Sequence, residues 1–246
     1  TEFTQSMKIV VVGGVAGGAS AAARARRLDE NAEIVVLQSG PDVSFASCGM
    51  PYYIGGEISD RKNMAVQTPE SLHDRLNLDI RVNTRVIKID VASKTVTALH
   101  DGKEYNESYD NLVLAVGAEP FKPPIPGIDR PGLFSLRNLQ DMDAIVEWIN
   151  ETTKTIPAEA MHCVVAGAGF VGLEMVEQLV RRNFNVTLVE LMPQILTPVD
   201  EEMAAILQRD LENRGVTVIT SDGIQEFQSG SGNASILKLQ SGRVLP

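Results

Sequence analysis

Two segments of the chain repeat one plan, in which a short apolar run enters a glycine-rich turn and a helical pattern follows. In the first copy Lys8–Val12 leads into residues 13–18, and in the second copy residues 163–166 lead into residues 167–172. Gly13 and Gly167 lie 154 positions apart. The runs after the two helices, Glu33–Leu37 and Asn185–Val189, are again β-branched. Each copy predicts a βαβ unit, so we expect an α/β chain with two Rossmann-like, doubly wound units.

The second turn carries a full dinucleotide fingerprint, with glycine at positions 167, 169 and 172. The first glycine permits the tight turn, the second lets a pyrophosphate approach the backbone, and the third lets helix and strand pack closely. Glu190 ends the next strand, where a carboxylate can accept both ribose hydroxyls and would repel a 2′-phosphate. No arginine follows it. This pattern predicts a site for NADH in preference to NADPH, and a plain βα turn is the alternative. The predicted contacts are Gly167, Gly169, Phe170, Val171, Gly172 and Glu190.

The first turn is less regular, because Val15 stands at the middle glycine position and Gln38 replaces the acid at the end of the second strand. An amide can hydrogen-bond a ribose hydroxyl, although without charge assistance. From these residues alone, a nucleotide loop and a purely structural turn both remain open.

Between the two copies the pattern changes to short strands with polar turns, which predicts a β-meander inserted in the first unit. A helix over 69–76 with Thr68 as its N-cap precedes the meander, and a strand over 111–116 follows it. The meander strands are predicted at Ile80–Val82, Arg85–Val91, Thr95–Leu99 and Tyr105–Tyr109. Four prolines in residues 120–126 indicate a stiff linker. We therefore expect domains at 7–119 and 136–246, joined by a linker at 120–135.

The second domain is predicted to contain helices at 139–149 and 201–213 and a strand at 216–220. A hairpin is predicted from 236–239 and 243–245. The chain stops on the second arm of that hairpin, so we expect it to be incomplete.

Cys48 and Cys163 are the two cysteines of the chain. Ser47 is predicted to cap a helix whose first turn contains Cys48, and a helix N-terminus favours the nucleophilic thiolate. The alternative is a small buried hydrophobic residue, which also suits Cys163 at the start of a buried strand. The basic cluster Arg24, Arg26 and Arg27 is either a helix C-terminus or a phosphate site.

Composition excludes several classes of function. The formal net charge of −10 makes nucleic acid and anionic lipid poor partners. No apolar run is long enough to span a membrane, and two cysteines with three scattered histidines predict no metal site. Residues 1–6 are interpreted as a tag remnant before Met7, and the absence of a signal peptide predicts a cytoplasmic protein.

Together these motifs resemble the FAD-dependent pyridine nucleotide-disulfide oxidoreductases. The single-cysteine branch is most similar: coenzyme A-disulfide reductase, NADH-dependent persulfide reductase, and NADH oxidase or peroxidase. The resemblance rests on residues 11–20 with Arg24–Leu28, on Ser44-Phe45-x-x-Cys48-Gly49, and on residues 109–118.

The resemblance implies that electrons pass from NADH through FAD to Cys48 and on to coenzyme A disulfide or a related disulfide or persulfide. It implies FAD contacts from Gly13, Gly14, Val15, Ala16, Gly17, Gly18, Gln38, Ala115, Val116 and Gly117. It implies substrate contacts from Ser20, Arg24, Arg27, Ser44 and Ser47, and a homodimeric full-length parent.

Two alternatives remain: an NADH oxidase or peroxidase that uses a Cys48 sulfenic acid, and an inert NADH-binding fragment. Family chains continue through a second flavin segment and a dimerisation domain, so we expect this chain to hold FAD weakly or not at all. Gln38 and Val116 also depart from the glutamate and threonine that are common in the family.

Overall fold

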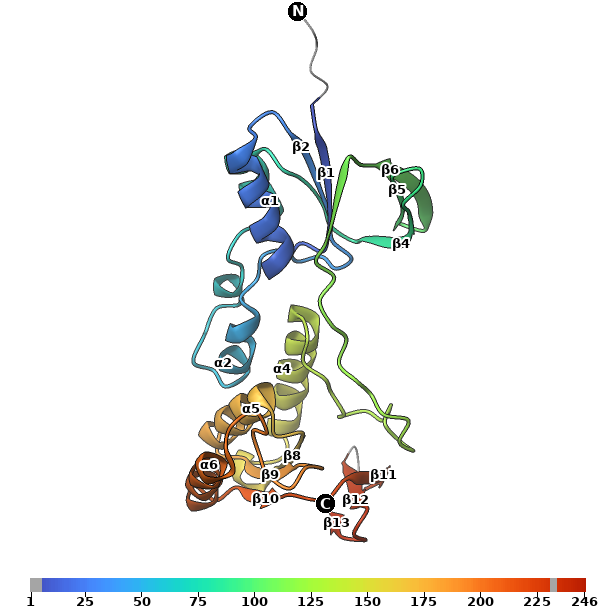
Figure 1. Ribbon diagram of the computed structural model, residues 1–246. Helices are drawn as coiled ribbons and strands as arrows, with labels where there is room; N and C mark the ends of the chain where they lie inside the picture. Colours follow the sequence, from blue (N-terminus) through green and yellow to red (C-terminus); the bar gives the residue numbers. More distant parts are fainter. Residues whose placement is uncertain (1–5, 231–233) are drawn as a thin grey trace, which may run out of the picture. The chain divides into compact units, whose positions relative to one another are not determined.

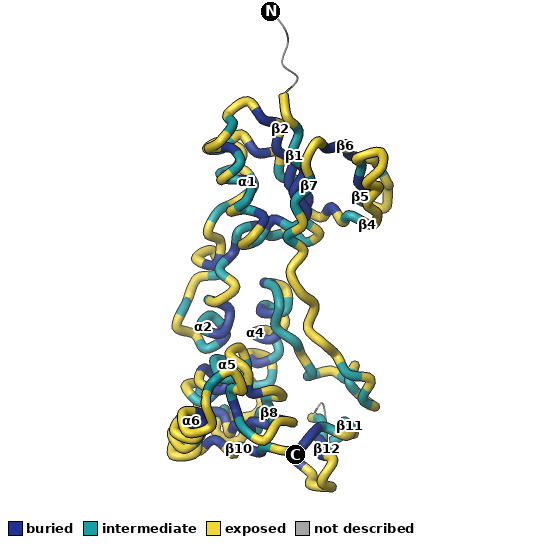
Figure 2. Tube along the Cα trace, viewed as in Figure 1, coloured by how far each residue is buried: buried dark blue, intermediate teal, exposed yellow. Residues whose placement is uncertain are grey.

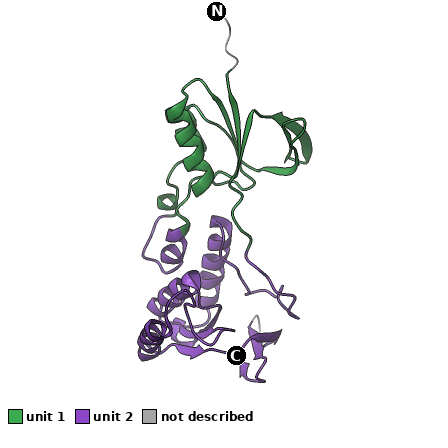
Figure 3. Cartoon of the chain, viewed as in Figure 1, with its two compact units in different colours: residues 1–47, 61–119 green, residues 48–60, 120–246 purple. Residues whose placement is uncertain are grey.

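The computed structural model describes residues 6–230 and 234–246, so the predicted tag lies outside it except for Ser6. The chain forms two compact units (Figure 3). Unit 1 contains the residues up to Ser47 together with Arg61–Glu119, and unit 2 contains Cys48–Asp60 together with Pro120–Pro246. The sequence assigned residues 48–60 to the first domain, whereas their contacts group them with unit 2.

Unit 1 is built on a four-stranded parallel sheet in the order β3-β2-β1-β7. Helices α1 and α3 cover one face, and an antiparallel meander of β4, β5 and β6 covers the other (Figure 1). The bounds are β1 Lys8–Val12, α1 Ala16–Leu28, β2 Glu33–Leu37, α3 Pro69–Leu76, β3 Asp79–Arg81, β4 Thr84–Asp90, β5 Thr95–His100, β6 Lys103–Ser108 and β7 Asn111–Leu114.

The prediction that Ile80–Val82 begins the meander is wrong, because β3 pairs in parallel with β2 at the edge of the main sheet. The meander therefore has three strands. A three-residue strand carries too little periodicity to reveal which sheet it joins, and this choice depends on contacts with β2 that are distant in the sequence.

The core of unit 1 follows the two-residue period of a strand buried on both faces. Val11 packs with Ala22 of α1 and Leu72 of α3, whereas Val10 and Val12 pack with the meander residues Val96 and Ala98. Figure 2 shows buried chain along β1 in dark blue. The central strand is thus fixed from both sides, which holds the turn at its carboxyl end in place.

One buried charge joins the meander to the sheet. Glu107 on β6 is 8% exposed. Its carboxylate lies 2.6 Å from Lys8 Nζ on β1 and also accepts a hydrogen bond from Arg81 on β3. Burial opposes ionisation of Glu107, but the hydrogen bonds from Lys8 and Arg81 outweigh it and lower the pKa of this carboxyl.

Unit 2 repeats this layering with a parallel sheet in the order β10-β9-β8 and an antiparallel sheet in the order β11-β12-β13. Val189 and Ile219 of the first sheet pack against Leu237, Leu239 and Leu245 of the second. The bounds are η1 Ser47–Gly49, α2 Met50–Ile54, α4 Leu139–Thr153, β8 His162–Ala166, α5 Phe170–Arg181, β9 Asn185–Val189, α6 Glu201–Asn213, β10 Thr217–Ile219, β11 Ile224–Ser229, β12 Ser235–Leu239 and β13 Val244–Leu245. Two short 3₁₀ helices, η2 Arg61–Met64 in unit 1 and η3 Ala158–Ala160 in unit 2, complete the elements.

The predicted hairpin is present as β12 and β13, and the sequence reasoning missed its partner β11. Polar residues dominate β11, which explains why its pattern gave no strand signal. Across the described ranges, none of the helices has the length and apolar character that crossing a membrane requires.

Candidate functional site

The two outer positions of the first glycine turn, Gly13 and Gly18, can hold no residue other than glycine. Gly13 has a φ of +97°, and a Cβ there would lie 2.1 Å from the Ala115 carbonyl oxygen. A Cβ at Gly18 would lie 1.7 Å from the carbonyl oxygen of Gly13. Both contacts are far inside van der Waals distance. Strand β1, the turn and α1 therefore meet as closely as backbone allows.

The second turn has the same geometry. Gly167 has a φ of +94°, and a Cβ at Gly172 would lie 2.0 Å from the Gly167 carbonyl oxygen. A Cβ at Gly169, in contrast, would meet no described atom within 4 Å. Gly169 thus serves the open side of the turn, where a pyrophosphate approaches the backbone in this motif.

The side chain at the end of each second strand holds its own turn. Gln38 Oε1 accepts a hydrogen bond from Gly14 N at 2.8 Å. Glu190 Oε2 accepts one from Ala168 N at 2.7 Å, and its Oε1 accepts one from Met192 N at 2.8 Å. Sequence reasoning assigned these side chains to ribose alone and missed this second role. Because each oxygen has two lone pairs, both side chains can still accept from a ligand.

The helices that follow the two turns begin without a side-chain cap. Neither α1 nor α5 has a capping hydrogen bond or an acidic residue in its first turn. By contrast, α3 and α4 begin with complete capping boxes, Thr68 with Ser71 and Asn138 with Asp141. The amino termini of α1 and α5 therefore offer backbone N–H donors and positive dipole ends to an anion.

The residues after β7 lie beside the first turn. Strand β7 ends at Leu114, two residues before the predicted end, and Ala115 N donates to the Val12 carbonyl at 2.8 Å. Val116 is 61% exposed, and Gly117 has a φ of +68°. The structure therefore brings Ala115 against Gly13 through backbone contacts.

Cys48 is exposed and lies in the 3₁₀ turn η1, just before α2. The N-cap of α2 is Gly49, which makes no side-chain cap, so the prediction that Ser47 caps this helix is wrong. Ser47 instead enters a tight turn, with its N–H donating to the Phe45 carbonyl at 3.1 Å. Cys163 is half-buried on β8, and burial raises the pKa of its thiol to about 11.

The basic cluster on α1 divides between two roles. Arg26 is 9% exposed and donates hydrogen bonds to the carbonyls of Leu76, Asn77, Asp29 and Glu30, so it joins the carboxyl ends of α1 and α3. For Arg26, this agrees with the interpretation that the basic cluster belongs to the C-terminus of a helix. Arg24 and Arg27 are exposed, and of these two only Arg27 lines a groove.

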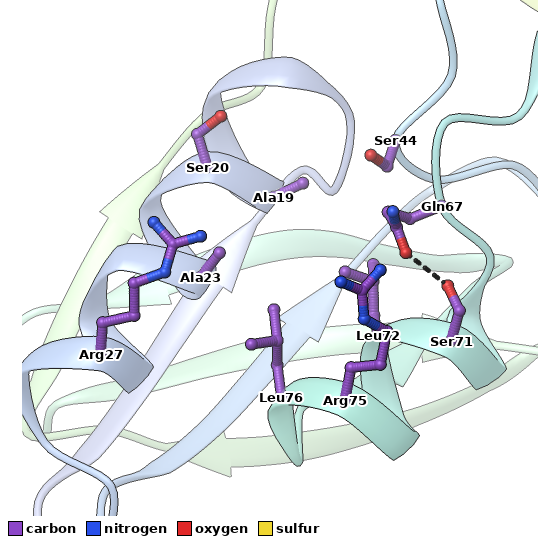
Figure 4. A pocket seen from close by; sticks show the side chains of 10 residues that line it. All are labelled: Ala19, Ser20, Ala23, Arg27, Ser44, Gln67, Ser71, Leu72, Arg75 and Leu76. Atoms are coloured by element: carbon purple, nitrogen blue, oxygen red, sulfur yellow. Dashed lines mark hydrogen bonds between the residues drawn. The ribbon is translucent and has the colours of Figure 1, made fainter.

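The groove lies between α1 and α3 in unit 1 and has a volume of about 410 Å³. Arg27 and Arg75 reach into it from the two helices (Figure 4). No carboxylate is among its described lining residues. Sequence reasoning missed Arg75, because the two helices are brought together only by the fold. The lining residues are Ala19, Ser20, Ala23, Arg27, Ser44, Gln67, Ser71, Leu72, Arg75 and Leu76.

Ser44 links this groove to the first glycine turn. Its N–H donates to the Gly14 carbonyl at 2.9 Å, and its own carbonyl accepts from Val66 N at 2.8 Å. Its φ of +43° is unusual for a residue other than glycine, and such strain concentrates at functional sites. Within the described ranges, no group of three His, Cys, Asp or Glu residues could hold a metal ion.

Comparison with known proteins decides the family. Residues 7–246 match the model of the pyridine nucleotide-disulphide oxidoreductases. The chain belongs to this family. The NADH oxidase of Methanocaldococcus jannaschii is 36% identical over 223 residues, which cover 90% of this chain and 48% of that protein. The coenzyme A disulfide reductase of Staphylococcus haemolyticus is 33% identical over 232 residues, covering 91% of this chain and 51% of that protein.

A solved structure of this oxidoreductase family supports the same fold. The reduced CoADR-RHD of Bacillus anthracis superposes with a TM-score of 0.91 at 46% identity and covers 98% of this chain and 42% of that one. The Rossmann-like fold predicted from the glycine turns is thereby confirmed. The chain spans about half the length of the curated relatives that it matches.

Proposed function

We propose that this oxidoreductase chain is the part of an NADH-dependent, flavin-dependent disulfide reductase that binds the nucleotides and supplies the reactive thiol, Cys48, with coenzyme A disulfide as its substrate. The observation that carries the proposal is the Arg27–Arg75 groove, because Ser44 in its wall precedes Cys48 by four residues. Four residues of extended chain span at most about 14 Å. At most four residues of chain therefore join the thiol to the wall of a groove that carries two arginines.

The first glycine turn suits FAD. The uncapped start of α1 presents backbone donors to a pyrophosphate, and Gln38 stands at the end of β2 to meet the adenosine ribose. Ala115, Val116 and Gly117 would line the other side of the turn. FAD, when bound, supplies the two-electron relay between NADH and the thiol.

The second glycine turn suits NADH. The start of α5 would hold the pyrophosphate, with Gly169 leaving the approach open. Glu190 would accept the ribose hydroxyls while it continues to accept the backbone N–H groups of Ala168 and Met192. Its carboxylate would repel a 2′-phosphate, and the residues after it, Leu191, Met192 and Pro193, carry no positive charge to compensate.

Coenzyme A is a phosphate-bearing thiol, and this chemistry matches the groove. A guanidinium binds a phosphate through two parallel hydrogen bonds, and two guanidiniums from facing helices can hold one phosphate or two neighbouring ones. Ser20 and Ser44 add hydroxyl donors around them. Molecular oxygen would need no such cationic groove.

The chemical step is thiol–disulfide exchange. The Cys48 thiolate attacks one sulfur of coenzyme A disulfide, a Cys48–coenzyme A disulfide forms, and one coenzyme A leaves as a thiolate. A hydride equivalent from NADH then supplies two electrons, which break the mixed disulfide and release the second coenzyme A. The net reaction converts one disulfide, NADH and a proton into two thiols and NAD⁺.

The first half of this reaction needs no flavin, so it tests the proposal on this chain. Intact mass should show one coenzyme A added per chain after incubation with coenzyme A disulfide, and none in Cys48→Ser. We expect Arg27→Met and Arg75→Met each to slow the addition about tenfold, the cost of one charge-assisted hydrogen bond. The exposed arginine change Arg85→Met on β4 is the control and should leave the rate unchanged. The proposal would be refuted if the unmodified chain and the three arginine variants added coenzyme A at the same rate. Addition of coenzyme A to the Cys48→Ser chain would refute it as well.

A second candidate function is an NADH oxidase or peroxidase, which the similarity to the Methanocaldococcus jannaschii protein favours. In that case hydrogen peroxide would convert Cys48 to a sulfenic acid with loss of water. A dimedone adduct at Cys48 that forms with peroxide faster than the mixed disulfide forms with coenzyme A disulfide would select this function.

A further inference from the structure

The segment that carries Cys48 packs within unit 2 on the helix that starts at the second glycine turn. Helix α2 follows Cys48 directly and contacts α4 and α5. Met50 and Ile54 of α2 are buried, at 5% and 0% exposure. Helix α5 begins at Phe170, with Gly169 as its N-cap. One helix therefore connects the proposed NADH site to the segment that bears the thiol.

Polar side chains at the far end of α5 hold the carboxyl end of α2. Gln178 Nε2 donates to Glu57 Oε1 at 2.8 Å, and Arg182 Nη1 donates to the Ile54 carbonyl at 2.9 Å. Arg181 Nε adds an ion pair with Glu57 at 3.4 Å. The Arg182 contact also places a positive charge at the negative end of α2.

Glycine at position 55 lets the end of α2 lie directly against the Gln178 side chain of α5. A Cβ at Gly55 would lie 1.9 Å from Gln178 Oε1 and 2.9 Å from Gln178 Cβ. Gln178 is completely buried, and its Oε1 has no hydrogen-bond partner in the part of the chain that the structure describes. Its orientation is set by Glu57, which can accept only from the amide nitrogen. A buried amide oxygen without a hydrogen-bond partner lowers the stability of the folded chain. The glutamine side chain at position 178 must therefore serve a purpose other than stability.

We propose that Gln178 and Arg182 are positioning residues for Cys48, acting through Gly55 and the Ile54 carbonyl to fix α2 and the turn before it on α5. The inference rests on the proposed role of Cys48. Five helical residues span only about 7 Å, so little slack separates the attachment from the thiol. The attachment makes Cys48 part of the NADH-binding unit, so that the thiol and α5 move together.

A spin label on Cys48 tests the attachment in the intact chain. The Cys163→Ala background leaves Cys48 as the one thiol to label. We expect Gly55→Ala and Arg182→Met each to shorten the rotational correlation time of the label at least twofold, because α2 is pushed off or released from α5. Gln178→Ala should remove the restriction in the same way, because it deletes the hydrogen bond to Glu57 and the side chain that lies against Gly55. Arg182→Lys, which keeps a donor, should restore part of it.

Gln208→Met is the matched control. Gln208 also donates from its amide to a glutamate of the same unit, Glu212 at 2.9 Å, but on α6 and away from α2. It should change neither label mobility nor melting temperature. Unchanged mobility in both Gly55→Ala and Arg182→Met, or an equal change in the control, would overturn the inference. If Gly55→Ala does not fold, the Arg182→Met and Arg182→Lys pair decides.

The rate of mixed-disulfide formation gives the functional readout. We expect Gly55→Ala and Arg182→Met each to slow it at least fivefold, with partial recovery in Arg182→Lys. An unchanged rate alongside a mobile label would show that the attachment does not position the thiol, and would overturn the inference. Failure of the unmodified chain to form the mixed disulfide would instead refute the proposed function, while label mobility would still test the attachment.

Discussion

Gln38 and Glu190 occupy equivalent places in the two units and differ by one functional group. Each accepts a hydrogen bond from the second residue of its own glycine turn. The bond to Gly14 N fixes the Gln38 amide with its oxygen toward the turn, so its nitrogen is left as the main donor toward a ligand. A ribose hydroxyl can donate to Glu190 but meets a weaker, uncharged partner at Gln38.

Exchanging these two residues should change the two nucleotide affinities in opposite directions. We expect Glu190→Gln to weaken NADH binding about tenfold, and Gln38→Glu to strengthen FAD binding by a similar factor, because a carboxylate acceptor gives a charge-assisted hydrogen bond. Isothermal titration calorimetry measures both. Glu212→Gln, an exposed change on α6, serves as the control. Unaltered NADH affinity in Glu190→Gln would remove Glu190 from the site.

The elements of unit 1 depend on long-range polar contacts as well as on apolar layers. Glu107 connects the meander to β1 and β3 through Lys8 and Arg81, at the side of the sheet that faces the meander. Hydrophobic layers of this kind could slide, whereas a buried carboxylate with two cationic partners accepts one register only. This contact helps to hold β1, and therefore the first glycine turn, in place.

Because the pKa of Glu107 is lowered in the folded protein, its stabilising contribution is present at neutral pH. It is lost as the pH falls below the ordinary value of 4.5 and through the lower folded value. Glu107→Gln should lower the free energy of unfolding at pH 7 by about 2 kcal/mol, since it leaves Lys8 and Arg81 partly unpaired. The difference from the original chain should shrink toward pH 3. Urea unfolding at a series of pH values measures both effects, and a difference independent of pH would argue against this contact.

At the scale of the whole molecule, the chain passes between the units through exposed backbone. Residues 116–122 are all exposed and belong to no helix or strand, and Phe121 is 85% exposed. The prolines at 120, 123, 124 and 126 keep this stretch extended. A second crossing occurs around Cys48–Asp60, which belongs to unit 2 although unit 1 residues flank it on both sides.

The exposed crossing should be the first point of proteolysis. Limited chymotrypsin digestion should cut after Phe121, at the start of the second segment of unit 2, before any site in the helices and strands of either unit, because a protease needs an accessible and extended backbone. Mass spectrometry identifies the fragments. Phe121→Ser should abolish this first cut and leave later cuts at their original rates. Early cleavage within a helix or strand of either unit would contradict the division.

The sequence by itself determined the features that local patterns encode. The two glycine turns, the βαβ units and the helix start at Thr68 all follow from spacing and residue type over fewer than forty residues. Glycine is required at Gly13, Gly18 and Gly172 because backbone meets backbone there, and that requirement is visible as a motif. The family resemblance was also available from these residues.

Only the tertiary structure decided what depends on partners distant in the chain. It placed β3 in the main sheet and brought Arg75 opposite Arg27. It also let Arg26 hydrogen-bond the ends of two helices and attached the Cys48 segment to α5. The physical reason is the same in each case. An arginine or a short strand has no periodic signature, and its role is fixed by contacts that form when helices and sheets pack together.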